Sequence, residues 1–130
     1  MPGPGKLLVD TDVMIDFLRQ RPAAAEFMRG APLPLSLSVV TVAELFAGVR
    51  EGRERALLET TLKAFSRLGI DEQAAILGGL YARDYGKSHG VELPDALIAA
   101  TASLHGCRLV TLNKKHYPML KDVLVPYAKR

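Results

Sequence analysis

The fold of this chain is decided near its start by residues 7–18, which read LLVDTDVMIDFL. Three consecutive apolar residues that end at Asp10 predict a short strand buried on both faces, as in a parallel sheet. Residues 12–20 follow with Val13, Ile15, Phe17 and Leu18 set among polar residues, a helix-like pattern. A buried strand that leads directly into a helix is typical of an α/β protein.

The same alternation continues through the rest of the chain. Further short strands are predicted at residues 35–38, 68–70, 108–112 and 123–125. Helices are predicted at residues 22–29, 42–49, 53–66, 72–89 and 94–105, with a helical turn at 114–117. The pattern predicts a single α/β domain over residues 1–130, with a mostly parallel central sheet of four to five strands flanked by helices on both faces. Residues 1–5 (MPGPG) are expected to be flexible.

The long helix predicted at residues 72–89 carries two packing signals. Its apolar residues Ile76, Leu77 and Leu80 are expected to face inward. The pair Gly78-Gly79 costs roughly 1 kcal/mol per residue relative to alanine in a helix. We therefore expect another segment to approach the backbone closely at this pair.

Composition restricts the class of protein. A chain of 130 residues fits one domain, and a net charge of +3 favours a polyanionic partner only weakly. The single cysteine, Cys107, excludes an internal disulfide and is interpreted as a small buried hydrophobe. No apolar run approaches the roughly 18 residues that span a bilayer, so a cytoplasmic protein is expected.

Polar side chains cluster just after the predicted strands. In open parallel sheets, ligands bind outside the carboxyl ends of the strands, so these side chains are candidates for a shared site. They are Asp10 and Asp12 after the first strand, Ser38, Thr41 and Glu44 after the second, Thr111 and Asn113 after the fourth, and Asp95 at the start of a helix on the same sheet.

Carboxylates held close together repel one another, and a hard divalent cation relieves that repulsion. Mg²⁺ or Mn²⁺ accepts carboxylate oxygens and keeps several waters, so it can activate water for attack on a phosphodiester. The three histidines, His89, His105 and His116, are scattered, and no Cys or His cluster has zinc-like spacing. The acidic constellation is therefore the candidate chemical site.

Each of these residues also has a purely structural interpretation. Asp10 and Asp12 can cap the helix that follows them, and Asp12 and Asp16 can share a solvated helix face. Thr41 and Glu44 have the spacing of a capping box. Asp95 can favour a helix N-terminus by its charge, and Asn113 can be a turn residue. Spacing alone leaves these alternatives open.

Four segments resemble the motifs of VapC-type PIN-domain ribonucleases, the toxins of VapBC toxin–antitoxin systems. They occur in order and span nearly the whole chain, and the third is the most specific. The segments are LLVDTDVMIDFL at residues 7–18, SVVTVAEL at 38–45, LPDALIAATA at 93–102 and LVTLNKKHY at 109–117.

This resemblance implies a Mg²⁺-dependent endoribonuclease, with Mn²⁺ as a possible substitute. Asp10, Glu44 and Asp95 are the implied metal ligands and catalytic residues, with Asp10 and Asp95 the most direct ligands. The implied supporting residues are Thr11, Thr41, Thr111 and Asn113. If the helix after the second strand starts as in the family, Ser38 rather than Thr41 is its cap, and Glu44 is free to bind metal.

Two positions lack an acid that relatives often carry. His116 stands where relatives often have an aspartate before the aromatic residue, and Asn113 stands where many carry a fourth acid. Fewer acids favour one well-occupied Mg²⁺ and leave a second metal open.

The resemblance also implies partners: an RNA substrate, a cognate VapB-like antitoxin that covers the active site, and a second copy of the chain in a homodimer. Basic residues near the predicted acids are candidates for contacts to RNA phosphates, with solvated surface charge as the plainer interpretation. They are Arg19, Arg21, Arg50, Arg53, Lys114 and Lys115.

Three other functions compete with this one. Asp10-Thr11-Asp12 after an apolar strand resembles the nucleophile pair of haloacid-dehalogenase phosphatases, but Met14 and the absence of a later acidic pair argue against it. A phospho-receiver module needs an aspartate where the second strand ends in Ser38. A PIN-like module that binds RNA or protein without cutting is the third, favoured by the missing acid before Tyr117.

Overall fold

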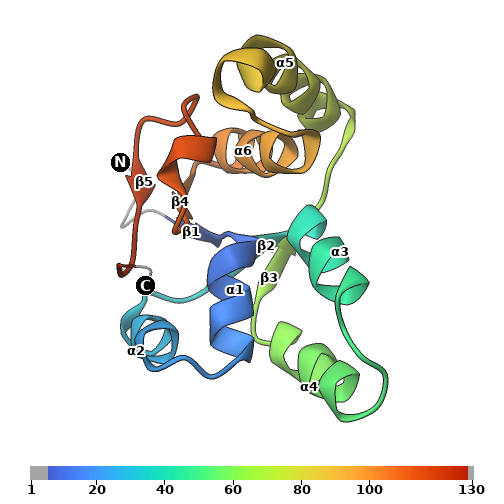
Figure 1. Ribbon diagram of the computed structural model, residues 1–130, viewed down its shortest axis with the longest axis vertical. Helices are drawn as coiled ribbons and strands as arrows, with labels where there is room; N and C mark the ends of the chain where they lie inside the picture. Colours follow the sequence, from blue (N-terminus) through green and yellow to red (C-terminus); the bar gives the residue numbers. More distant parts are fainter. Residues whose placement is uncertain (1–5, 129–130) are drawn as a thin grey trace.

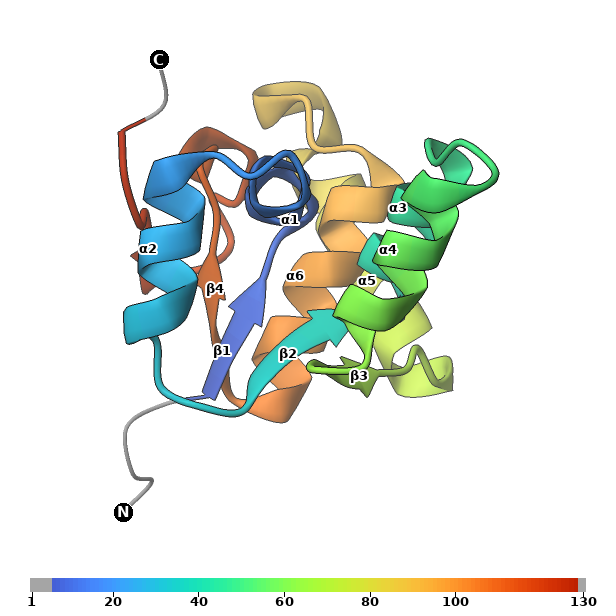
Figure 2. The same cartoon turned by 90° about the horizontal axis from the view of Figure 1, so that it is seen from below.

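The computed structural model describes residues 6–128, so the expectation that residues 1–5 are flexible lies outside the described part. Its centre is a five-stranded sheet in the order β3-β2-β1-β4-β5, and every neighbouring pair is parallel (Figure 2). The strands are β1 (Lys6–Val9), β2 (Leu35–Ser38), β3 (Ser66–Leu68), β4 (Cys107–Val110) and β5 (Val123–Leu124). The predicted α/β class and parallel sheet are confirmed.

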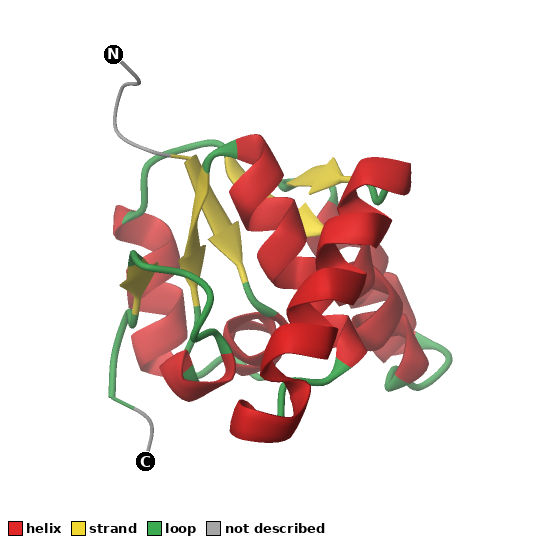
Figure 3. Cartoon of the chain, turned by 90° about the horizontal axis from the view of Figure 1, so that it is seen from above, coloured by secondary structure: helices red, strands yellow, loops and turns green. Residues whose placement is uncertain are grey.

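Helices flank this sheet on both faces, as Figures 1 and 3 show. They are α1 (Thr11–Leu18), α2 (Pro22–Gly30), α3 (Val39–Ala47), α4 (Arg53–Leu62), α5 (Glu72–His89) and α6 (Leu93–His105), with a short 3₁₀ turn η1 (Lys114–His116). In Figure 1, α1, α2 and α4 lie on one side of the sheet, and α6 lies on the other with α5 outside it. None of the helices described here is long and apolar enough to cross a membrane.

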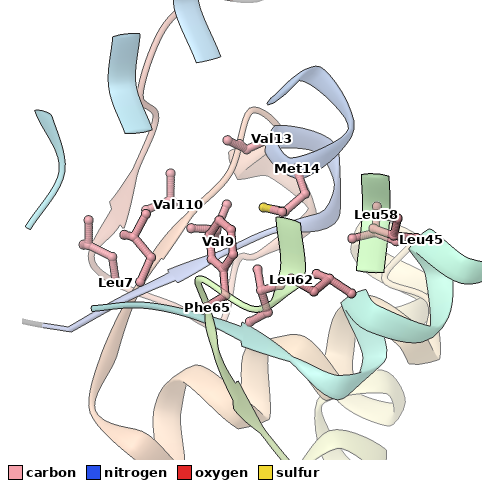
Figure 4. Close-up of a cluster of buried hydrophobic side chains, with 11 residues drawn as sticks. Leu7, Val9, Val13, Met14, Leu45, Leu58, Leu62, Phe65 and Val110 are labelled. Carbon is pink, nitrogen blue, oxygen red and sulfur yellow. The ribbon is translucent and has the colours of Figure 1, made fainter. Parts of the chain in front are cut away.

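Two apolar clusters hold these layers together. Successive side chains of a strand point to opposite faces, so Leu7 and Val9 of β1 join one cluster and Leu8 joins the other. The first cluster, drawn in Figure 4, packs β1 against Met14 of α1 and Leu62 of α4. Because β1 is the middle strand and buried on both faces, the residue that follows it is fixed relative to all layers.

Helix α3 begins where the family resemblance implied. Ser38 is its N-cap, and its hydroxyl accepts a hydrogen bond from the backbone N–H of Val40 at 3.1 Å. Thr41 lies inside the helix, so the interpretation of Thr41 and Glu44 as a capping box is wrong. Glu44 is therefore exposed and available for other contacts.

Several sequence predictions for β3, α4 and α5 need correction. Strand β3 ends at Leu68 instead of beginning there, and α4 ends at Leu62 rather than at residue 66. Ile76 and Leu80 are 59% and 39% exposed, so the prediction that they face inward is wrong. The reason is that α5 lies against α6 and not against the sheet, so only a narrow side of it is covered.

Gly78 and Gly79 of α5 have different surroundings. A Cβ on Gly78 would lie 2.5 Å from Leu97 Cδ2 and 3.2 Å from Leu97 Cα, so the predicted close approach is confirmed there. Apart from its chain neighbours and the backbone of its own helix, no described atom lies within 4 Å of a Cβ built on Gly79, so the prediction is wrong at that residue. Leu97 is two residues from Asp95, so this contact fixes the start of α6 against α5.

Candidate active site

Asp10 is anchored at the carboxyl end of the central strand. Its backbone N–H donates to the carbonyl of Val110 at 2.8 Å, so it continues the ladder between β1 and β4. Its carboxylate is buried: Oδ1 accepts from the backbone N–H of Thr11 at 2.8 Å, which makes Asp10 the N-cap of α1. Oδ2 accepts from the hydroxyls of Thr111 and Tyr117, each at 2.8 Å. The predicted capping role and a position in the site are thus both true of this residue.

Asp95 reaches the same point from the opposite side. It lies in the first turn of α6, after Pro94. The Tyr117 hydroxyl is 3.4 Å from its Oδ1, and Nδ1 of His116 is 3.3 Å from its Oδ2. One buried hydroxyl therefore lies between the carboxylates of Asp10 and Asp95, which come from separate elements.

Glu44 joins through a pair of threonines. Thr11, the first residue of α1, donates its hydroxyl to Glu44 Oε1 at 2.7 Å, and the same hydroxyl lies 2.9 Å from Thr41 Oγ1. Thr41 is fully buried on α3, one turn before Glu44. Burial raises the pKa of Asp95, and the nearby charge of Glu44 adds to this effect.

The segment after β4 closes the site. Thr111 donates to Asp10 and lies 3.2 Å from Asp12 Oδ2, which also accepts from the backbone N–H of Leu112 at 3.0 Å. The backbone N–H of Asn113 donates to the Thr111 hydroxyl at 3.1 Å. The Asn113 side chain instead faces His116, with Nδ2 3.1 Å from Nδ1, so it reaches Asp95 only through that ring.

Burial and like charge shape the ionisation of the site. Burial, followed by the charge of Asp12, raises the pKa of Asp10 from 3.8 to about 7, and hydrogen bonds from Thr111, Tyr117 and Thr11 only partly offset this. Burial also raises the pKa of Asp95, against the opposing effect of His116. Burial and the nearby carboxylates raise the pKa of Tyr117, so its hydroxyl stays protonated and can donate.

The chemistry of the site suits a hard cation. Its donors are carboxylate and hydroxyl oxygens, and no Lys, Arg or His within residues 6–128 forms an ion pair with the buried Asp10. The side chains of the described residues do not gather three or more Asp, Glu, His or Cys groups tightly enough to enclose a metal ion. Mg²⁺ does not require such a cage, because it is usually held by one or two carboxylates and keeps several waters.

Two cavities flank the sheet. One of about 450 Å³ lies between α1, α3 and α4, with Glu44, Arg19 and Arg50 among its lining residues. A larger one, of about 570 Å³, lies at the amino ends of β1 and β4, near Leu7 and Cys107, and none of the site acids lines it. Of these two cavities, the smaller is lined by one site acid, Glu44, and the larger by none.

Residues 7–119 match the PIN domain family, which covers most of the chain and all of the site just described. The chain belongs to the PIN-domain family. This PIN domain is 40% identical to ribonuclease VapC19 of Mycobacterium tuberculosis over 125 residues, covering 92% of this chain and 98% of the relative. It is 38% identical to ribonuclease VapC10 of the same organism, covering 94% and 93%. The predicted VapC-type likeness is confirmed.

Solved structures agree with the family. A toxin–antitoxin complex from Klebsiella pneumoniae contains a chain that is 27% identical, with a TM-score of 0.83, covering 95% of this PIN domain and 100% of that chain. The family assignment removes the haloacid-dehalogenase and phospho-receiver alternatives.

The PIN domain brings the predicted site residues into one hydrogen-bonded network, although their catalytic and metal-binding roles stay predictions. Asp10, Asp95 and Thr111 lie at its centre, and Glu44 joins through Thr11 and Thr41. The Asn113 side chain does not contact the acids directly, because it contacts His116, which in turn contacts Asp95.

Sequence reasoning assigned no role to two side chains of the site. Tyr117 is buried with its hydroxyl on Asp10, and His116 lies against Asp95. A signal for Tyr117 was available: a tyrosine at a core position needs a partner for its hydroxyl. The solvated face proposed for Asp12 and Asp16 is wrong, because Asp16 is buried and contacts Arg21 and Tyr127.

Proposed function

We propose that this PIN domain is a Mg²⁺-dependent endoribonuclease, the toxin of a type II toxin–antitoxin pair, which hydrolyses RNA phosphodiesters. The observation that carries the proposal is the pair of carboxylates, Asp10 and Asp95, that share one buried hydroxyl while Asp10 has no cationic partner among the described residues. A buried acid with neighbouring acids and no counter-ion is characteristic of sites that bind a cation or move protons. The names of VapC19 and VapC10 support RNA as the substrate.

Asp10 and Asp95 would bind the Mg²⁺ directly, with Glu44 as the third acid of the site and Mn²⁺ as a substitute. When bound, the metal supplies an activated water and offsets the negative charge that builds up on phosphorus. Thr11 orients Glu44, while Thr111 and the backbone of Thr11 hold the Asp10 carboxylate in one orientation. These contacts fix both acids before substrate arrives, so little reorganisation is needed during the reaction.

The carboxylates by themselves repel RNA, so cations must hold the phosphates. Arg19 and Arg50 line the cavity beside Glu44, and Lys114 and Lys115 are exposed on η1, next to His116. We propose that these four side chains contact the RNA backbone on either side of the acids. Arg21 is not included because its guanidinium already pairs with Asp16.

A cognate VapB-like antitoxin is the proposed protein partner, and the supporting observation is that a similar solved structure is a toxin–antitoxin complex. A homodimer in the cytoplasm is proposed with it. Sedimentation of the purified chain tests the dimer, and inhibition of RNA cleavage by the co-expressed antitoxin tests the pair.

The decisive experiment is cleavage of end-labelled RNA by the purified chain after removal of metal with EDTA. Cleavage should return with Mg²⁺ or Mn²⁺ and should be absent in Asp95→Asn. The matched control is Asp84→Asn, because Asp84 is an exposed acid on α5 that pairs with its neighbour Arg83 and is not part of the site. Equal activity of the two variants, or full activity in EDTA, would refute the proposal.

A second function has one observation in its favour. His116, and not an acid, contacts Asp95, so the site has fewer carboxylates than the motif of its relatives usually supplies. A PIN domain that binds RNA or protein with little cleavage is the alternative. Binding of labelled RNA by wild type without metal-dependent cleavage would select it.

A further inference from the structure

Tyr117 has its ring in the core and its hydroxyl in the site. The ring packs with Leu8, Ile98 and Leu109 in the second apolar cluster, and the residue is 1% exposed. Its backbone N–H donates to the carbonyl of Lys114 at 3.0 Å, which ties it to η1. The core therefore fixes the place of the hydroxyl, because a close-packed ring cannot move without opening a void.

That hydroxyl connects acids from two separate elements. It donates to Asp10 Oδ2 at 2.8 Å and lies 3.4 Å from Asp95 Oδ1. Asp10 directly follows β1 and Asp95 is in the first turn of α6, so the main chain alone does not bring their carboxylates to one point. Holding two acids at one donor opposes their mutual repulsion.

The two acids depend on this hydroxyl to different degrees. Without it, Asp10 would keep the Thr111 hydroxyl and the backbone N–H of Thr11. Among the side chains of residues 6–128, Asp95 would then keep its contact with His116, which is itself exposed. A phenylalanine would fill the same space and leave Asp95 free to change its side-chain rotamer.

We propose that Tyr117 is a positioning residue of the metal site: its hydroxyl holds Asp95 beside Asp10 so that both carboxylates are in place to bind the cation. This inference rests on the function proposed above. Partners that orient metal ligands typically contribute about 10- to 100-fold to metal affinity. Because the hydroxyl is buried, it acts through the acids and does not touch RNA.

The test compares Tyr117→Phe with Tyr127→Phe. Tyr127 also donates its hydroxyl to a buried aspartate, Asp16 Oδ2 at 2.9 Å, so the control removes the same type of hydrogen bond outside the site. Calorimetric titration with Mn²⁺ alone should show about tenfold weaker binding for Tyr117→Phe and no change for Tyr127→Phe. Steady-state cleavage should show a lower kcat for Tyr117→Phe with an unchanged KM for RNA.

The outcomes separate this inference from the proposed function. Wild type that neither binds Mn²⁺ nor cleaves RNA with it would refute both. Wild type that binds Mn²⁺, with Tyr117→Phe binding equally or more tightly, would refute only the role of Tyr117. If Tyr117→Phe fails to fold, NMR of wild type decides: a Tyr117 hydroxyl proton protected from water and shifted by Mg²⁺ supports the role, and a rapidly exchanging one overturns it.

Discussion

Helix α1 and its N-cap contain two aspartates, Asp10 and Asp16, that are equally buried but have different charged neighbours. Asp10 and Asp16 are 6% and 7% exposed, and each accepts a tyrosine hydroxyl, at 2.8 Å from Tyr117 and 2.9 Å from Tyr127. Asp16 also has a counter-ion, because Arg21 Nε lies 3.2 Å from its Oδ1. Asp10 instead faces further acids, and the charge of Asp12 adds to burial in raising its pKa.

This difference teaches that burial of a carboxylate does not by itself mark a functional site. A buried charge with a cation and a hydroxyl is satisfied, and its removal mainly costs stability. A buried charge left among like charges is a source of instability that a bound cation relieves. The following predictions test whether Asp10 and Asp16 divide into function and stability in this way.

The largest effect is expected from Asp10→Asn. Loss of several kcal/mol of metal-based charge stabilisation corresponds to about a 1,000-fold loss of cleavage. The thermal midpoint should stay the same or rise, because a buried charge without a cation is removed. Cleavage rates and thermal unfolding of the same preparation measure both. If the variant lost stability as well as activity, Asp10 would contribute to stability as Asp16 does, and the proposed difference between the two aspartates would be wrong.

The second prediction concerns pH and unfolding. The pKa of Asp10 is about 7 in the folded chain against an ordinary 3.8, so the folded protein keeps a proton that the unfolded chain loses first. The free energy of unfolding should therefore fall as pH rises from about 4 to 7 and then level off, by at most about 4 kcal/mol for this residue. Urea titrations across this range should show the fall in wild type and a weaker one in Asp10→Asn. Identical pH profiles would contradict the assignment.

A smaller effect is expected from Asp16→Asn. The variant loses the ion pair with Arg21 and weakens the bond from Tyr127, which should destabilise the fold by about 1–2 kcal/mol. Metal-dependent cleavage, assayed well below the unfolding temperature, should remain at the wild-type level. A loss of activity beyond that explained by the unfolded fraction would show that the two aspartates are coupled.

The smallest effect is expected from Mg²⁺ on unfolding. At a concentration tenfold above its dissociation constant, a ligand that binds only the folded state adds about 1.4 kcal/mol. At pH 8 this should raise the thermal midpoint of wild type and of Asp16→Asn by about 4 °C, and that of Asp10→Asn much less. Mg²⁺-free buffer of matched ionic strength is the control. Equal shifts in all three proteins would indicate a nonspecific salt effect.

Local sequence patterns predicted the parts of the fold that depend on local chemistry. The apolar run before Asp10 predicted the buried central strand, and Pro94 with Asp95 predicted the start of α6. The position of the acids followed from the rule that ligands bind at the carboxyl ends of parallel strands. Ser38 as the cap of α3 came from the family likeness, since Thr41 and Glu44 offered an equally good local pattern.

The parts that were missed depend on contacts between distant segments. Asp16 and Tyr127 are 111 positions apart, and Asp10 and Tyr117 are 107 apart, so no local spacing predicts either hydrogen bond. Ile76 and Leu80 have helical spacing, but that spacing does not tell what covers the helix. In each case the missing information was which element lies next to which.

The position of β1 in the middle of the sheet also has a consequence for synthesis. Strand β1 is made first, yet its neighbour β4 begins at Cys107, and Thr111 and Tyr117 follow it. A nascent chain on the ribosome therefore carries Asp10 long before the groups that hold its carboxylate have been translated. Such a chain should be inert toward RNA until the segment through Tyr117 has emerged, so a ribosome that makes this protein meets an assembled site only after that segment has left the exit tunnel.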